Sequence, residues 1–182
     1  MKLRIAFLVT TLFLGLSSAS FSQSYGWKDK NNCPATDTAS RRSVDGFGGM
    51  MIITPDADWE EKWNTPSGTS PFYKKVNEAK VGETIYILSF FSNPKSNPLH
   101  VVNISCDIQI IQPDGTVAMT EKNRPCFHGV LGGAPEMIYM TNAAVGFMGE
   151  EKDPKGVWTV KLAMKDQLRT EPVMLMQSFT LK

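Results

Sequence analysis

The alternation of apolar and polar residues predicts two long β-strands in the second half of the chain. One covers residues 100–112, where the apolar residues and Cys106 share one parity while polar residues hold most of the other positions. The second covers residues 157–165 and places on one face Trp158, Val160, Leu162 and Met164. Side chains two positions apart lie on the same face of a strand. Each strand is therefore expected to turn one face toward a core, and Cys106 is expected to be buried.

Shorter patterns predict the remaining elements. Residues 84–91 are apolar at both parities, which is typical of a central strand covered on both faces. The turn sequence Pro113-Asp114-Gly115 has residues preferred at successive turn positions. Trp59 and Trp63 lie four residues apart in an acidic segment, which predicts a short helix near residues 56–64. Further strands are expected at 50–53, 116–120, 137–141, 143–147 and 173–181, with a loop at 121–135.

These elements predict one all-β domain. About seven short strands, joined by turn signals and without a long helical period, favour an antiparallel β-sandwich. The domain is expected to cover residues 46–182, with Trp158 packed near Cys106. Residues 23–45 are polar and lack an apolar period, so they are expected to form an irregular N-terminal arm.

The first residues have the pattern of a signal peptide, which we assign to residues 1–22. Two basic residues precede a short apolar run at 5–16, and small residues follow it. The preferred cleavage site lies before Gln23, and the alternative lies after Ala19. An uncleaved membrane anchor would need a longer apolar run. The sequence therefore predicts an exported protein, periplasmic or secreted, without a stable membrane anchor after cleavage.

Charge limits the possible partners of the mature chain. Removal of residues 1–22 takes two of the 19 basic residues and leaves 17 against 18 acidic ones, a formal charge of −1. Nucleic-acid binding depends on an excess of positive charge. A nucleic-acid partner is therefore not expected.

The three cysteines allow one disulfide with one residue left over. Export into an oxidising compartment favours pairing. We expect a Cys106–Cys126 bridge, because Cys106 points inward and Cys126 follows about twenty residues later, after a hairpin. A Cys33–Cys126 bridge and three reduced thiols remain alternatives, and the role of Cys33 stays open. No cysteine is expected to be catalytic.

Several segments resemble immunoglobulin-like modules of exported bacterial proteins. The resemblance rests on three features: the turn at 113–115, the strand opening Gly156-x-Trp158, and the final strand that ends at Leu181. Residues 46–48, 56–59 and 62–64 are similar to uncharacterised periplasmic proteins of that kind. The resemblance implies an immunoglobulin-like sandwich in the periplasm and no established activity.

Candidate catalytic and metal-binding groups are weak. The common hydrolase motifs are absent. His128 follows Cys126 by two residues, but such neighbours point apart in extended chain, and a bridged cysteine cannot attack a substrate. The acidic run Asp56-x-Asp58-x-Glu60 lacks the glycine of a calcium loop. We therefore expect no catalytic residue, no metal ligand and no cofactor.

A binding role remains the preferred interpretation. Trp59 and Trp63 are candidate contact residues because aromatic side chains dominate interfaces, although both could be buried instead. Phe127 and His128, in the predicted loop, are further candidates. We expect an exported, non-catalytic binding or accessory protein whose partner is another protein. Alternatives are a periplasmic immunity protein against a delivered toxin, a copper carrier that uses the scattered methionines, and an unrecognised enzyme.

Overall fold

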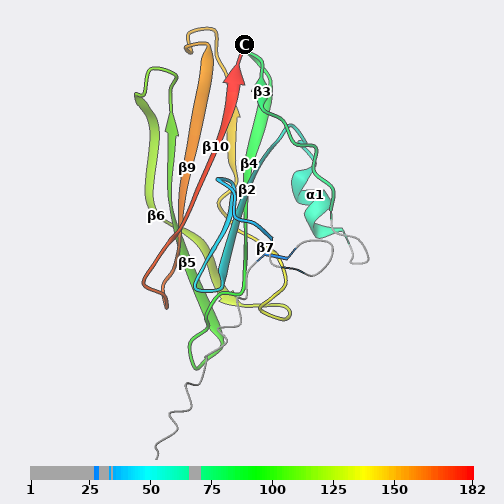
Figure 1. Cartoon of the computed structure of the whole chain (residues 1–182). Helices are drawn as coiled ribbons and strands as arrows, with labels where there is room; N and C mark the ends of the chain where they lie inside the picture. Colours follow the sequence, from blue (N-terminus) through cyan, green and yellow to red (C-terminus); the bar gives the residue numbers. More distant parts are fainter. Residues whose placement is uncertain (1–26, 29–32, 34, 66–70) are drawn as a thin grey trace, which may run out of the picture.

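The protein folds into two facing β-sheets with one short helix outside them (Figure 1). The computed structural model describes residues 27–28, 33, 35–65 and 71–182, so the predicted signal peptide lies outside the described residues. In the described ranges there are ten strands, several of them only two to four residues long. The predicted all-β fold is confirmed, and the short strands explain why there are more than the expected seven.

The first sheet is built around a strand that is buried on both faces. This strand, β4 (Thr84–Ser92), pairs with β2 (Phe47–Thr54) on one side, and β2 pairs with the edge strand β1 (Arg41–Val44). On its other side β4 pairs with β7 (Tyr139–Met140) and then with β8 (Val145–Met148). The prediction of a central strand at residues 84–91 is confirmed.

The second sheet contains the three longest strands of the described chain. Its order is β3 (Glu78–Ala79), β10 (Val173–Leu181), β9 (Gly156–Asp166), β5 (Val101–Ile111) and β6 (Val117–Val130). All pairs are antiparallel except β3 with β10.

The core lies between the sheets, where the predicted inward faces of β5 and β9 meet the first sheet. Val102, Ile104, Cys106 and Ile108 of β5 are all buried, and so are Trp158, Val160, Leu162 and Met164 of β9. The predicted bridge between Cys106 and Cys126 is confirmed and joins β5 to β6, with a Cα–Cα distance of 5.8 Å. Cys33 is exposed and lies outside this bridge. The bridge indicates an oxidising, non-cytoplasmic compartment.

The helix α1 (Trp59–Asn64) covers the outer face of the first sheet (Figure 1). It begins at Trp59 rather than near residue 56, because Asp56 makes other bonds. The carboxylate of Asp56 accepts hydrogen bonds from the Lys62 ammonium at 2.8 Å and from the Lys74 backbone N–H at 3.0 Å. Asp56 therefore fixes the approach of the following chain to α1 instead of lying in its first turn.

Three local predictions are wrong. The predicted loop at 121–135 is strand up to residue 130, because β6 continues beside β5 through three register shifts. The predicted irregular arm contains β1, held by its pairing with β2. Trp158 does not pack near Cys106, because the β9 residue opposite Cys106 is Met164, six positions from Trp158. The Trp158 ring instead contacts Phe147 and Phe179.

The edge strand β6 carries features that discourage pairing with another chain. Its register shifts bend the strand, and Pro125 removes a backbone donor. Lys122 is an exposed charge, and Asn123 adopts a left-handed conformation with φ 52°. Such irregularities protect exposed sheet edges against strand addition. Binding by addition of a strand to this edge is therefore disfavoured.

Candidate functional site

A buried ion pair lies where β9 ends and the chain turns toward β10. The Asp166 side chain is 0% exposed and that of Arg169 is 8% exposed, and Nε of Arg169 donates to Oδ2 of Asp166 at 3.1 Å. The same Oδ2 accepts the Lys95 backbone N–H at 2.8 Å, and Oδ1 accepts that of Leu168 at 3.1 Å. Both carboxylate oxygens are thus hydrogen-bonded, as a buried charge requires.

Arg169 also binds two loops that are distant in sequence. Its Nη1 donates to the backbone carbonyl of Asp45, and its Nη2 donates to that of Asn93 at 3.1 Å. Asn93 in turn donates its backbone N–H to the carbonyl of Pro135 at 2.6 Å and its side-chain amide to that of Gly46 at 3.0 Å. The loops at residues 45–46, 93–100, 131–138 and 167–172 are thereby joined. We call this part of the molecule the clamped end.

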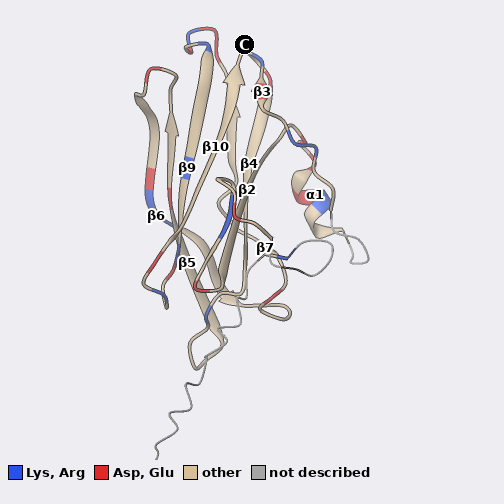
Figure 2. Cartoon of the chain, in the orientation of Figure 1, with Lys and Arg blue, Asp and Glu red and all other residues tan. Residues whose placement is uncertain are grey.

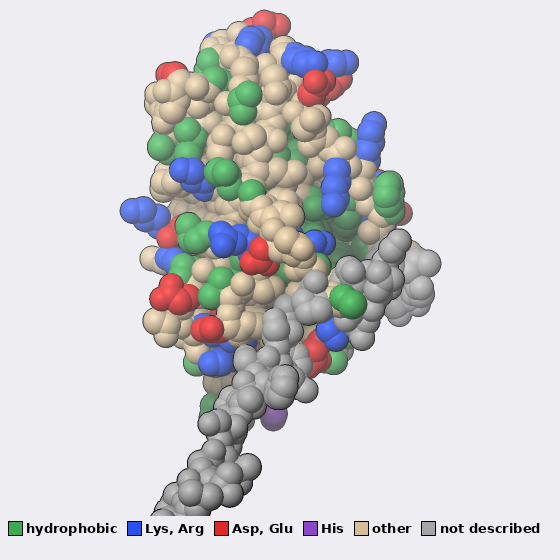
Figure 3. All heavy atoms as spheres, viewed as in Figure 1, with side chains coloured by type: hydrophobic (Ala, Val, Ile, Leu, Met, Phe, Trp, Pro, Cys, Tyr) green, Lys and Arg blue, Asp and Glu red, His purple; other side chains and the backbone are tan. Residues whose placement is uncertain are grey.

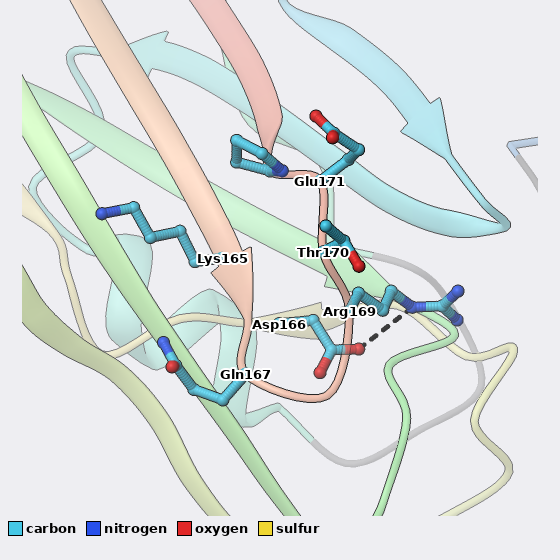
Figure 4. A pocket seen from close by; sticks show the side chains of 7 residues that line it. Lys165, Asp166, Gln167, Arg169, Thr170 and Glu171 are labelled. Carbon is cyan, nitrogen blue, oxygen red and sulfur yellow. Dashed lines mark hydrogen bonds and ion pairs between the residues drawn. The ribbon is translucent and has the colours of Figure 1, made fainter.

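A pocket of about 260 Å³ adjoins the ion pair and is lined by residues 165–167 and 169–172. Asp166 and Arg169 point toward one another, and Lys165 is directed away from them (Figure 4). The Lys165 ammonium donates to the carboxylate of Asp107 at 2.7 Å, and this bond is the main reason why the pKa of Asp107 is lowered. Three charged groups of the pocket lining, those of Lys165, Asp166 and Arg169, are therefore already engaged in bonds within the protein.

Exposed apolar side chains gather on the clamped end. Among the described residues, eleven large apolar side chains are exposed, and five of them belong to these loops or to the strand end beside them. These five are Leu99, Val130, Met137, Ile138 and Leu168. Leu99 is 77% exposed. The same loops also carry four exposed charged residues, Asp45, Lys95, Glu136 and Glu171.

The opposite end of the sandwich has a different surface. It comprises residues 80–83, 112–116 and 149–155 together with the C-terminal Lys182 (Figure 1). Its loops carry charges of both signs, which form surface ion pairs (Figures 2 and 3). Lys152 pairs with Glu150 at 2.6 Å, Lys182 with Glu78 at 2.7 Å, and Lys80 with Glu83 at 4.0 Å. Three exposed large apolar residues, Val117, Met148 and Val157, lie on the strand ends beside these loops.

The structure brings Trp59 and Trp63 together on the inner side of α1, where both are half-buried. The Trp59 ring lies 6.4 Å from that of Tyr86, and the Trp63 ring lies 5.6 Å from that of Phe90. Both tryptophans thus cover the outer face of β4. Most of their contact with the protein serves packing, and their role as contact residues stays a prediction.

Phe127 and His128 do not join the two tryptophans. They are neighbours on β6, in the second sheet, and as adjacent strand residues they point to opposite faces. Phe127 packs edge-on against Phe91, with ring centroids 5.1 Å apart. His128 is exposed and pairs across the strands with Asn103. Phe127 is half-buried, and His128 lies two residues from Val130 near the clamped end; the role of both as contact residues stays a prediction.

Two classes of site are not found in the described ranges. No group of three or more His, Cys, Asp or Glu side chains could hold a metal ion there. Among the same residues, no helix is long and apolar enough to cross a bilayer.

Comparisons with known proteins give only weak structural similarities. No family model and no curated protein matches the chain. Among solved structures it is similar to a family 123 glycoside hydrolase from Clostridium perfringens, with a TM-score of 0.42 and 10% identity over 74% of this chain and 27% of that one. An alkylpurine DNA glycosylase from Pseudomonas fluorescens gives a TM-score of 0.38 and 15% identity over 58% of this chain and 28% of that one.

A third similar structure is a Niemann-Pick type C2 protein from the Japanese carpenter ant. Its TM-score is 0.39, with 11% identity over 72% of this chain and 89% of that one. The chain spans less than a third of the length of the first two structures. With TM-scores this low, none of the three similarities supports an argument about function.

One feature of the sequence indicates the buried ion pair, although it was not among the predicted site features. Asp166 occupies the next inward position of β9 after Met164, and a carboxylate at an inward position requires a buried partner. Nothing in the spacing of the sequence pointed to Arg169 as that partner or to Asn93 as the link to the other loops.

Proposed function

We propose that this protein is an exported, periplasmic binding protein with an immunoglobulin-like β-sandwich, and that it binds another protein without catalysing a reaction. The observation that carries this proposal is that the buried charged groups at the clamped end bond to other groups of the protein itself. The pocket there places Asp166 and Arg169 together, but each is held by bonds inside the protein. A general acid or base must instead reach a substrate proton.

The export signal and the disulfide support the periplasmic location. The basic and apolar pattern of residues 1–22 is typical of a signal peptide, and a stable bridge such as Cys106–Cys126 is typical of oxidising compartments. Two facing sheets whose strand pairs are antiparallel, except β3 with β10, support an immunoglobulin-like arrangement.

The test is reconstitution of a defined complex. The mature chain, starting at Gln23, would be used to capture proteins from the periplasm of the producing cells, and the captured protein would then be purified. Isothermal titration is expected to give a one-to-one complex with a Kd in the micromolar range or below. The proposal is contradicted if no purified candidate binds at about 100 μM, or if the mature chain binds Cu(I) tightly instead.

A further inference from the structure

The clamped end is preorganised, which distinguishes it from an ordinary set of surface loops. Within the loop at 93–100, Oδ1 of Asn97 accepts the backbone N–H groups of Leu99 at 2.9 Å and of Val101 at 3.0 Å. His100 adopts a left-handed conformation with φ 60°, which is uncommon for a residue with a Cβ. Such conformations persist where the surrounding structure fixes them. Leu99 is therefore held in an exposed position rather than left free to fold back.

The loop at 131–138 is fixed in the same way. Ser92 donates its hydroxyl to the carbonyl of Glu136 at 3.0 Å, and Tyr139 donates its hydroxyl to that of Ala134 at 2.8 Å. This loop exposes Met137 and Ile138 by 56% and 45%. Loops that are already ordered lose little conformational entropy when a partner binds. Apolar side chains on ordered loops are thus well suited to recognition.

The size and charge of this end indicate the kind of partner. The four loops hold about two dozen residues, close to the roughly 20–30 that one side of a stable protein interface contains. Their exposed charges are Lys95 against Asp45, Glu136 and Glu171. An excess of carboxylates disfavours an anionic lipid surface, which attracts basic residues. It favours a protein whose contact surface has basic residues at its rim.

We propose that the clamped end is the binding surface of this protein and that its partner is a folded protein with an apolar patch bordered by basic residues. This inference rests on the proposed function and adds the location of the site and the chemistry of the partner. The opposite end provides an internal control, because Met148 and Val157 are 54% and 55% exposed but flank the loop 149–155, which carries charges of both signs.

Site-specific photo-crosslinking in the producing cells tests the proposal. The photoreactive residue p-benzoylphenylalanine would replace Leu99 or Ile138 at the clamped end, and Met148 or Val157 at the opposite end. Each full-length variant should unfold within about 3 °C of the parent protein, since the replaced side chains are exposed. If the variant at Leu99 or Ile138 unfolds at a lower temperature than this, the photoreactive residue would be placed at position 137 instead.

We expect a discrete adduct with one other protein from positions 99 and 138 and none from 148 and 157. Protein adducts from 148 or 157 alone would overturn the inference and leave the proposed function standing. Adducts with lipid, or with a second copy of this chain, would also overturn it, because the partner would then be of another kind. Absence of any protein adduct at all four positions would overturn the inference, and the proposed function would also fail if titration detected no protein that binds.

Discussion

The two ends of the sandwich use charged residues in opposite ways. At the clamped end the central charges, Asp166 and Arg169, are buried and bind loops, while five large apolar side chains are exposed around them. At the opposite end the charges are exposed and pair with one another in solvent, as Lys152 does with Glu150. Exposed ion pairs contribute little to stability, whereas removing one partner of a buried pair is costly. The comparison suggests that one end is built to be solvated and the other to be covered.

The largest effect is expected from Arg169→Ala. This change leaves the Asp166 carboxylate buried without its partner and removes the bonds to the carbonyls of Asp45 and Asn93. Breaking a buried ion pair costs about 3–5 kcal/mol in the free energy of unfolding, measured by urea denaturation. The double variant with Asp166→Ala should lose less than the sum of the single changes, because the two residues act on one bond. Additive losses would show that the pair is not coupled.

A smaller loss is expected at Asn93, where two replacements separate two causes. Asn93 has φ 53° and donates its side-chain amide to the carbonyl of Gly46. Asn93→Gly tolerates the positive φ and loses only the hydrogen bond, about 1 kcal/mol. Asn93→Ala also adds left-handed strain and should lose about 2–3 kcal/mol. Equal losses in urea denaturation would mean that the backbone conformation contributes nothing.

A still smaller effect is expected at Asp107, on the outer face of β5. The Lys165 ammonium and the Asn123 backbone N–H lower the pKa of this carboxyl below its usual 3.8. A lowered folded-state pKa stabilises the protein above pH 3.8, and this contribution disappears as the pH falls through the folded-state value. Asp107→Asn should cost at most about 1 kcal/mol at pH 7, because the pair is partly exposed. Denaturation at pH 7 and at about pH 2 should show this difference shrinking in acid; an unchanged difference would contradict the assignment.

The smallest effect is expected from Lys152→Ala at the opposite end. The ammonium pairs with Glu150 in solvent, and although this bond raises the pKa of Lys152, it holds no other part of the fold. The midpoint of thermal unfolding should not change measurably. A clear destabilisation would remove the contrast between the two ends.

Sequence patterns predicted the fold better than the candidate site, for a physical reason. The alternation along β5 and β9 reports burial directly, so the inward faces and the partner of Cys106 could be inferred. Arg169 and Asn93 act through backbone carbonyls of distant loops, and backbone groups leave no trace in the sequence.

The contrast between side-chain patterns and backbone contacts also explains the wrong predictions of a loop at 121–135 and of an irregular arm. β6 does not alternate cleanly because its register shifts repeatedly against β5, so it resembled a loop. β1 is held by its pairing with β2, and the Trp27 indole donates to the carbonyls of Arg42 and Gly49. These backbone contacts also produce no periodic pattern of apolar residues in the sequence. The tryptophans of α1 were assigned to a short helix correctly, but their degree of exposure depends on the outer face of β4.

The affinity of the purified partner for two double variants tests the central claim most directly. Leu99→Ser with Ile138→Ser removes two apolar side chains from the clamped end, and Met148→Ser with Val157→Ser does the same at the opposite end. Each apolar side chain buried in an interface contributes roughly 1.5–3 kcal/mol, so the clamped-end variant should raise Kd by about 100-fold or more. The opposite-end variant should leave Kd unchanged within about twofold. The account is contradicted if the opposite-end variant weakens binding while the clamped-end variant does not.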